Sequence, residues 1–323
     1  STMPAPLAKA PADSLPLELL PDHARWARLL ANLRFVVLDE SHTYRGVFGS
    51  HVALIVRRLR RLCAHYGAAP QFVCCSATSA NPQEHLAALV GAPVTLVDDD
   101  GAPQGARQFV LWNPPVIEPR TKNREPRGGA TGSRSSVLNS QSAGDSGRRR
   151  STNIETASLL ASLVRANVKT LAFTRTRRGA ELVLRYTRES LENGSAALAE
   201  RVAAYRAGYT SEDRRRLEQA FLHGELLGLV STNALELGVD IGGVDAVLIA
   251  GFPGTMASAW QQSGRAGRSQ GHSLAALVAQ DDPLDQFYMR HPEQFFARAH
   301  EHARVALENP FILTEQLRCA AAE

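Results

Sequence analysis

Two adjacent carboxylates, Asp39 and Glu40, end an apolar run in the sequence FVVLDESH at residues 35–42. At the end of a strand, the first carboxylate can hold Mg²⁺ while the second orients and deprotonates a water that attacks a nucleotide phosphate. A strand that simply ends in an acidic surface turn has the same pattern. The residues alone favour neither interpretation, so the acidic pair is a candidate site that needs further support.

Small hydroxyl residues follow the next apolar run, as SAT at residues 76–78 directly after residues 71–75. At a strand end, Ser76 and Thr78 can hydrogen-bond to a neighbouring site and so couple it to another part of the molecule. The same residue types are common N-caps of helices, and taken alone the SAT sequence is better explained as a cap.

A third group of polar residues lies in STNALELGVDIG at residues 231–242. Thr232 and Asn233 follow an apolar run and can donate hydrogen bonds to phosphate oxygens. Gly238 and a second glycine four residues later let the backbone approach a ligand closely, with Asp240 held between them. The spacing indicates a loop that faces phosphate groups.

Two arginines three positions apart, Arg265 and Arg268, lie in QQSGRAGR at residues 261–268. Each follows a glycine, so both side chains can sit close to a polyphosphate with little obstruction. Arginine suits this role because its planar, always charged guanidinium binds phosphate through two hydrogen bonds. A solvated basic turn is the alternative, and the glycines together with Gln261 make that interpretation less favoured.

Short β-branched runs alternate with helical stretches on both sides of a segment rich in Pro, Gly, Ser and Arg. This alternation predicts an α/β fold, in which parallel sheets are covered on both faces and polar residues act from loops at the carboxyl ends of strands. Strands are predicted at residues 35–38, 71–75, 94–97, 108–112, 169–173, 201–205, 227–231, 246–249 and 274–279. Helices are predicted at residues 50–66, 82–90, 154–166, 178–192, 211–223 and 257–264.

The chain has 323 residues, enough for two domains, and its 44% apolar and 21% charged residues are typical of a soluble globular protein. Disorder throughout and a fibrous architecture are thereby excluded. The longest uncharged stretch, residues 246–264, contains Pro253, and the four cysteines form no C-x-x-C pair. We therefore expect no membrane segment, no zinc or disulfide framework and a cytoplasmic location.

The net charge of +4 is concentrated in one segment. Residues 119–150 contain eight basic and two acidic residues, a net +6, which leaves −2 for the rest of the chain. We expect residues 116–152 to form a flexible basic linker between two lobes. A binding arm for nucleic acid and a solvated spacer explain its charge equally well.

The order of these motifs along the chain adds a resemblance to a known family. DESH, SAT, TNALELGVDIG and QQSGRAGR resemble motifs II, III, V and VI of superfamily 2 helicases. FTR at residues 173–175 resembles motif IV, and YRAG at residues 205–208 resembles the nucleic-acid contact segment that follows it. HTYRGVFGSHV (residues 42–52) and ASAWQQSGRAGR (residues 257–268) are similar to the MrfA/SftH branch of bacterial DEAD/DEAH-box DNA helicases. This resemblance, from about residue 29 to residue 319, implies two RecA-like parallel-sheet lobes.

The resemblance implies a role for each motif residue by its position. Asp39 would coordinate Mg²⁺, with Glu40 as the general base. Arg265 and Arg268 would be arginine fingers that complete the ATP site. Coupling of hydrolysis to strand movement would involve His42, Ser76 and Thr78. Nucleotide contacts would come from Gly238, Asp240 and Gln261, and contacts to the phosphates of the strand from Thr174, Arg175, Arg206 and Thr232.

ATP and Mg²⁺ are thus the implied cofactors, and single-stranded or tailed duplex DNA is the implied partner, in DNA repair. One part of the family pattern is missing. The phosphate-binding loop G-x-x-x-x-G-K-[ST] occurs nowhere, because none of the three lysines follows a glycine. The resemblance implies that the strand before this loop lies between the strands that end in DESH and SAT. Because this chain lacks the loop, its first lobe is predicted to be incomplete. The sequence resembles the middle of a longer helicase, and we expect no ATPase or unwinding activity from this chain alone.

Two functional hypotheses follow. The first is the core of an ATP-dependent helicase that couples ATP hydrolysis to strand translocation. The second is a non-enzymatic nucleic-acid-binding or regulatory remnant of a helicase, and binding of ATP with Mg²⁺ distinguishes the two. Both share one predicted organisation: an irregular N-terminal segment (1–30), a partial RecA-like lobe with motifs II and III (31–115), the linker (116–152), a second lobe with motifs IV to VI (153–310) and a C-terminal tail (311–323).

Overall fold

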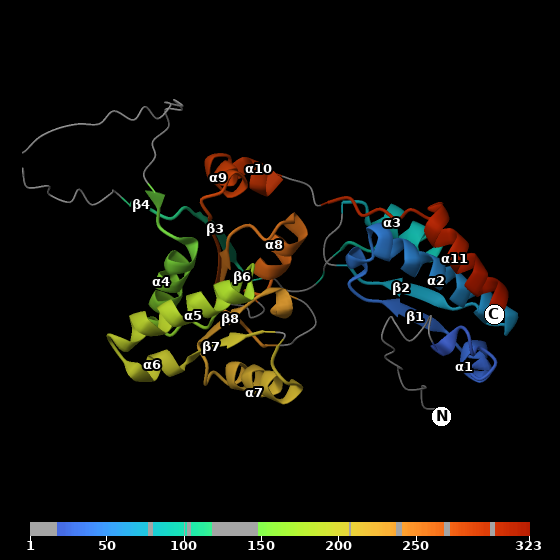
Figure 1. The fold of residues 1–323 in the computed structure, drawn as a ribbon, viewed down its shortest axis with the longest axis horizontal. Helices are drawn as coiled ribbons and strands as arrows, with labels where there is room; N and C mark the ends of the chain where they lie inside the picture. Colours follow the sequence, from blue (N-terminus) through green and yellow to red (C-terminus); the bar gives the residue numbers. More distant parts are fainter. Residues whose placement is uncertain are drawn as a thin grey trace, which may run out of the picture. The chain divides into compact units, whose positions relative to one another are not determined.

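The computed structural model describes residues 18–76, 80–99, 101, 105–117, 148–206, 208–236, 241–267, 272–297 and 301–323. Four predicted site residues lie outside this described part: Thr78, Gly238, Asp240 and Arg268. The chain divides into two compact units, a first unit of residues 1–102 and 299–323 and a second unit of residues 103–298 (Figure 1).

Six parallel strands form the sheet of the second unit, in the order β3-β10-β9-β6-β8-β7. Side chains alternate between the two faces, so Leu171 and Phe173 enter one core and Ala172 enters the other. This burial on both faces is typical of parallel sheets covered by helices. The strands are β3 (Arg107–Trp112), β6 (Thr170–Thr174), β7 (Val202–Tyr205), β8 (Gly228–Ser231), β9 (Ala246–Ala250) and β10 (Ser273–Val278).

Helices cover both faces of this sheet. Thr176 caps the helix that follows β6 by accepting a hydrogen bond from the amide of Gly179, and Thr255 caps the helix that follows β9 in the same way. These caps fix where each strand-end loop stops. One face packs against α4 (Thr152–Arg165), α5 (Arg177–Glu192) and α6 (Ala196–Glu200) (Figure 1). The other face packs against α7 (Ser211–Leu222), α8 (Met256–Ser263), α9 (Pro283–Arg290) and α10 (Pro292–Ala297).

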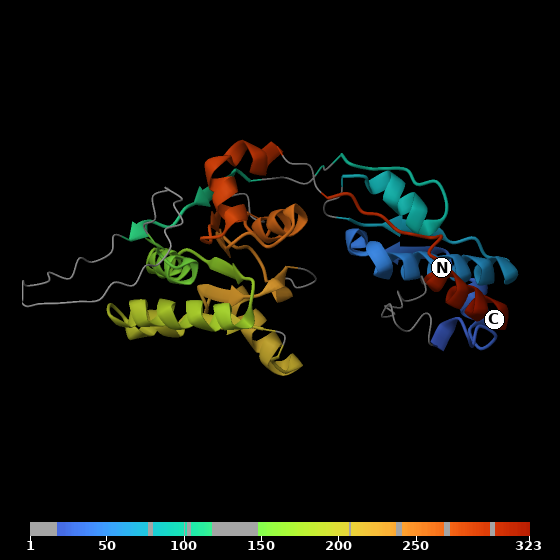
Figure 2. The same cartoon turned by 45° about the horizontal axis from the view of Figure 1, so that its top comes forward.

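Two parallel strands form the sheet of the first unit, β1 (Phe35–Leu38) and β2 (Gln71–Cys74). Helix α11 lies beside α2 (Figure 2), where the carboxylate of Glu323 and the amide oxygen of Gln316 accept hydrogen bonds from the buried guanidinium of Arg58. The helices of this unit are α1 (Ala27–Ala31), α2 (Gly46–His65), α3 (Pro82–Val90) and α11 (Pro310–Ala322), with a 3₁₀ turn at Ser41–Thr43.

The two strands of the first unit pair directly with each other, beginning with Phe35 opposite Gln71. The prediction that another strand lies between them is therefore wrong, because the hydrogen-bond ladder joins them along all their residues. On the face of this sheet turned away from α2, Phe35, Val37 and Val73 are 59%, 52% and 40% exposed. Within the described residues, this apolar face has no covering layer.

The predicted α/β class with parallel sheets is confirmed, but several elements differ from the prediction. Residues 94–97 form no strand, and among the described strands none pairs with them. Residues 107–112 pair with β10 in the second unit and not with the first. Helix α11 forms where only a tail is predicted, because Asn309 caps it and Ile312 packs inward.

The chain passes between the units at residues 102–103 and again at 298–299. Within the second unit, β4 (Val116–Ile117) pairs antiparallel with β5 (Arg148–Arg149). The connections between the units are thus different segments from the linker predicted at residues 116–152. In the described parts of the chain, no helix is long and apolar enough to cross a bilayer.

Candidate functional site

The acidic pair lies in a tight turn after β1. Glu40 has a left-handed backbone (φ 48°, ψ 42°), and its amide donates to Oδ1 of Asp39 at 2.9 Å. A non-glycine residue in this conformation costs on the order of 1 kcal/mol and persists only where its surroundings fix it. The local contacts of the turn are therefore part of the site.

Ser41 fixes the turn to the end of the neighbouring strand. Its amide and its hydroxyl both donate to the carbonyl of Cys75, at 2.9 and 2.8 Å, and the side chain is fully buried. His85 of α3 adds a longer hydrogen bond of 3.4 Å from Nε2 to the carbonyl of Ser41. Burial lowers the pKa of His85, and a carbonyl only accepts, so the neutral ring carries its proton on Nε2.

The DESH motif and Ser76, the first residue of SAT, thus follow the carboxyl ends of two paired strands. Nδ1 of His42 lies 3.6 Å from Oε2 of Glu40, whose side chain is 33% exposed. Burial and the nearby Asp39 raise the pKa of Tyr44, whose backbone amide donates to the carbonyl of Ser41. Ser76 is exposed immediately after this strand end, so its coupling role stays a prediction.

A pocket of about 200 Å³ lies at the carboxyl ends of β6, β8 and β9 in the second unit. The hydroxyl of Thr174 donates to the carbonyls of Thr176 and Ser231, so this side chain joins two strand ends. Arg175 follows it and is exposed. The pocket is lined by Phe173, Thr174, Arg175, Asn233, Glu236, Ile249, Ala250, Gly251, Pro253, Ser258 and Gln262.

Two further residues assigned to phosphate contact do not line this pocket. Thr232 precedes the 3₁₀ turn at Asn233–Leu235, and the residues of this segment that line the pocket are Asn233 and Glu236. Arg206 pairs with Glu181 at 3.1 Å and lies over the ring of Tyr209. Its side chain is 40% exposed, and its contact with a nucleic-acid strand stays a prediction.

The arginine of motif VI is buried against motif V. Arg265 is 7% exposed, and both its Nε, at 3.1 Å, and its Nη2 donate to the carbonyl of Glu236. The amide nitrogen of Gln262 donates to the carboxylate of Glu236 at 3.2 Å. Glu236 and Gln262 are 8% and 5% exposed. In this structure Arg265 therefore holds two motifs together, and its role as an arginine finger stays a prediction.

Sequence reasoning missed three residues of this region. Glu236 and Gln262 stand inside motifs V and VI. The signal for Glu236 was a carboxylate between two leucines, whereas Gln262 stands among polar residues and had no such signal. Asp285, at the start of α9, is 1% exposed and accepts hydrogen bonds from the amides of Phe252 and Gln280. Burial raises the pKa of Asp285, which anchors the loop after β9 that forms one wall of the pocket. No local pattern marked it.

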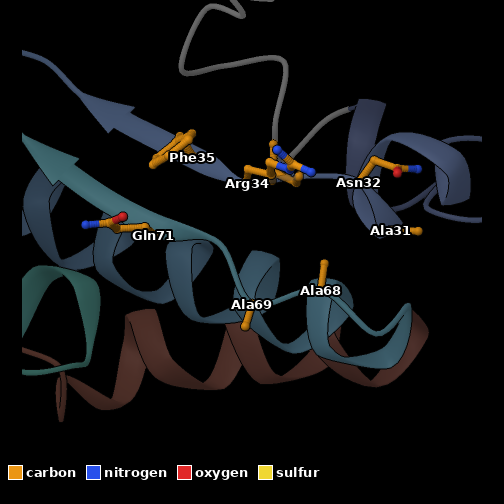
Figure 3. Close-up of a pocket in the computed structure, with 8 residues that line it drawn as sticks. Ala31, Asn32, Arg34, Phe35, Ala68, Ala69 and Gln71 are labelled. Carbon is orange, nitrogen blue, oxygen red and sulfur yellow. The ribbon is translucent and has the colours of Figure 1, made fainter. Parts of the chain in front are cut away.

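A second hollow, of about 450 Å³, lies in the first unit near the start of β1 and β2 (Figure 3). Arg34, Phe35 and Gln71 line it. This is the opposite end of the strands from the acidic turn, and parallel α/β sheets act from their carboxyl ends. The hollow is therefore separate from the candidate site.

Comparison with known proteins identifies the family. The DEAD/DEAH box helicase model matches residues 15–86, and the helicase conserved C-terminal domain model matches residues 155–270. The chain is 44% identical over 311 residues to the uncharacterized ATP-dependent helicase YprA of Bacillus subtilis (strain 168), covering 96% of this chain and 38% of that protein.

Solved structures agree with this match. The crystal structure of the DUF1998 helicase MrfA bound to DNA has a TM-score of 0.84 and 43% identity, covering 96% of this chain and 38% of that one. The structure of MrfA bound to DNA and AMPPNP has a TM-score of 0.83 and 43% identity, covering 96% and 40%. The chain thus spans about two fifths of the length of these relatives.

The two units are RecA-like lobes, and the chain belongs to the superfamily 2 helicases of the DEAD/DEAH-box class. Within that class it is of the MrfA type. The resemblance and the fold class expected from the motifs are confirmed. The roles of the individual motif residues stay predictions.

Proposed function

We propose that this chain forms the core of an ATP-dependent DNA helicase that couples ATP hydrolysis to movement along one strand. The observation that carries the proposal is the position of the motif residues. In each lobe they gather at the carboxyl ends of parallel strands, around the acidic turn in one lobe and the pocket in the other. The similarity to MrfA bound to DNA and AMPPNP supports the same two ligands here.

The acidic turn suits a Mg²⁺ ion that is shared with phosphate oxygens. One oxygen of Asp39 is engaged by the amide of Glu40, which leaves the other oxygen for a cation. Mg²⁺ is commonly held by one or two carboxylates together with waters and substrate phosphates, and when bound it neutralises charge on the phosphates. Glu40 would accept the proton of the attacking water, and its partial exposure leaves room for that water.

The pocket in the second lobe suits one phosphodiester group of a DNA strand. Arg175 supplies a positive charge at the pocket, and Asn233 supplies a neutral donor from the next strand end. A volume of about 200 Å³ is small for a nucleotide and adequate for a phosphate with part of its sugar. Single-stranded or tailed DNA fits best, because such a site follows a backbone and reads no base pair.

The absent phosphate-binding loop favours a second candidate for the chain acting alone. Without a loop of the form G-x-x-x-x-G-K-[ST], the chain has no lysine and backbone cradle for the β- and γ-phosphates. The second candidate is a non-enzymatic nucleic-acid-binding or regulatory module. Both candidates require DNA binding, and they differ in hydrolysis of ATP.

A first titration tests the DNA-binding pocket that both candidates require. Fluorescence anisotropy with a labelled single strand should show that Arg175→Ala weakens binding about threefold to tenfold and reduces the salt slope of log K by about 0.7, the value for one lost phosphate contact. The control is Arg185→Ala, which removes an exposed arginine of α5 paired with Glu189. Equal affinities for the two variants would remove the pocket from the proposal.

The same protein is then titrated with labelled ATP and Mg²⁺, with and without DNA. We predict DNA binding without ATP turnover for this chain alone. Turnover that disappears in Glu40→Gln would contradict the expected inactivity and favour the helicase core acting unaided. Tight DNA binding without any ATP binding would favour the non-enzymatic module.

A further inference from the structure

A short segment that follows the second lobe in the sequence belongs structurally to the first. Residues 301–307, called here the return segment, run past α2 and α3 before α11 begins (Figure 2). Ala303 is 4% exposed, and Val305 and Leu307 pack on the core around Leu86. The segment therefore belongs to the packed structure of the first lobe.

One asparagine side chain holds the return segment at α3. The side chain of Asn81 pairs with the backbone of Ala303 in both directions, because Oδ1 accepts from its amide at 3.0 Å and Nδ2 donates to its carbonyl at 3.1 Å. Asn81 occupies the N-cap position of α3 but makes no side-chain capping bond there. Its Nδ2 also donates to the carboxylate of Glu84 in the first turn of α3 at 3.3 Å, so this side chain links the return segment to the start of the helix.

Two more contacts reach the start of α2. The amide of Gly46, the first residue of this helix, donates to the carbonyl of Arg304 at 2.8 Å. The buried hydroxyl of Ser50 accepts from the amide of Ala306 at 2.8 Å and donates to the carbonyl of Gly46 at 2.8 Å. The return segment and the first turn of α2 therefore share one hydrogen-bond network.

Close packing at the same place excludes side-chain bulk. A Cβ atom on Gly49 would lie 2.2 Å from the carbonyl oxygen of Tyr44 and 3.0 Å from a methyl group of Val305. The backbone of Tyr44, just after the acidic turn, therefore packs closely on the first turn of α2 at Gly49. Val305 of the return segment contacts the same place.

We propose that the return segment is a positioning element for the acidic turn, and that Asn81 and Ser50 are its positioning residues. The turn has two ends. The carbonyl of Cys75 holds the end near Ser41, and the network around Gly46 holds the other. Fixing both ends keeps Glu40 in its left-handed conformation, which an unsupported glutamate rarely adopts. The importance of this support for hydrolysis rests on the proposed function, whereas the support itself can be measured without any activity.

Amide hydrogen exchange of the whole chain, followed by mass spectrometry of peptides, tests the proposal. Asn81→Ala and Ser50→Ala should each speed exchange of the amides at residues 41–46 about tenfold, because each change loosens the return segment, whose Arg304 carbonyl accepts from the amide of Gly46. The amides of the middle of α2, residues 54–62, serve as the internal reference and should keep their rates.

A matched control perturbs the neighbouring chain without touching the turn. Asn309 caps α11 by accepting from the amides of Phe311 and Ile312, so Asn309→Ala should speed exchange only near the start of α11. The proposal is overturned if Asn81→Ala and Ser50→Ala speed exchange in the return segment alone. It is equally overturned if they speed exchange uniformly across α2, since the segment would then be a general stability element.

Discussion

Replacement of Arg265 by alanine gives the sharpest test of the link between motifs V and VI. An arginine finger waiting for nucleotide would be exposed and would contribute little to the stability of its own lobe. Arg265 is instead 7% exposed and donates through two nitrogens to the carbonyl of Glu236. We therefore predict that Arg265→Ala destabilises the second lobe in the absence of any ligand.

The magnitude follows from what the substitution removes. A hydrogen bond from a charged donor contributes about 1.5–3 kcal/mol, and the two bonds count once because they share one acceptor. Burial of the three methylenes of the stem contributes about 2 kcal/mol. Hydration of the guanidinium in the unfolded chain offsets part of this sum, so we expect a loss of about 2–4 kcal/mol. With a urea slope of about 2 kcal/mol/M, the unfolding midpoint falls by about 1–2 M.

The assay is equilibrium unfolding in urea, followed by tryptophan fluorescence. Trp112 and Trp260 lie in the second lobe and Trp26 lies in the first, so a Trp26→Phe background confines the signal to the second lobe. Trp260 packs against Phe109 and reports directly on α8, which carries motif VI. Arg185→Ala, at an exposed site, is the matched control and should shift the free energy of unfolding by less than about 0.5 kcal/mol.

A free energy of unfolding for Arg265→Ala within about 0.5 kcal/mol of the control would refute this reasoning. The contact between Arg265 and Glu236 would then contribute nothing to the stability of the second lobe, and Arg265 could leave it at little cost to act as an arginine finger. In a protein that carries all the helicase motifs, both Arg265→Ala and Arg268→Ala should slow hydrolysis about a thousandfold if both act as fingers. Normal turnover in either variant would exclude that residue from the finger role.

Two further predictions concern the first lobe. Burial lowers the pKa of His85, so the unfolded chain binds a proton on this residue more tightly than the folded chain does. The free energy of unfolding therefore falls as the pH drops below about 6.5. His85→Gln should reduce the fall in Tm between pH 7 and pH 5. Arg58→Ala leaves the carboxylate of Glu323 buried at 2% exposure with only the half-exposed Arg61 still paired to it. It should cost about 3 kcal/mol by urea unfolding followed at Trp26, against less than about 1 kcal/mol for Arg61→Ala.

Much of the fold could be predicted because its strands and helices follow from the pattern of apolar and polar residues within each short segment. The unbroken apolar run of Leu171, Ala172 and Phe173 indicates a strand buried on both faces, and that is how β6 is built. The motifs are placed at strand ends because they begin where these apolar runs stop, and the structure confirms this placement for Glu40 and Thr174.

Other features depend on contacts between segments that are distant in sequence, and a single sequence does not show which distant segments are in contact. The run that forms β3 looks like any half-buried strand, and only its pairing with β10, more than 160 residues later, assigns it to the second lobe. Arg265 has the neighbours of an exposed arginine in the sequence, and its burial depends on the backbone of Glu236. The contacts of Asn81 with Ala303 have no local signal for the same reason.

The two passages of the chain between the lobes have a consequence for synthesis. Residues 299–323 belong to the first lobe, yet a ribosome makes them only after all of the second lobe. Until those residues are made, the Arg58 guanidinium and the flank of α2 lack α11, whereas the six described strands of the sheet in the second lobe have already been synthesised. The second lobe can thus reach its native state while the first lobe still lacks residues 299–323.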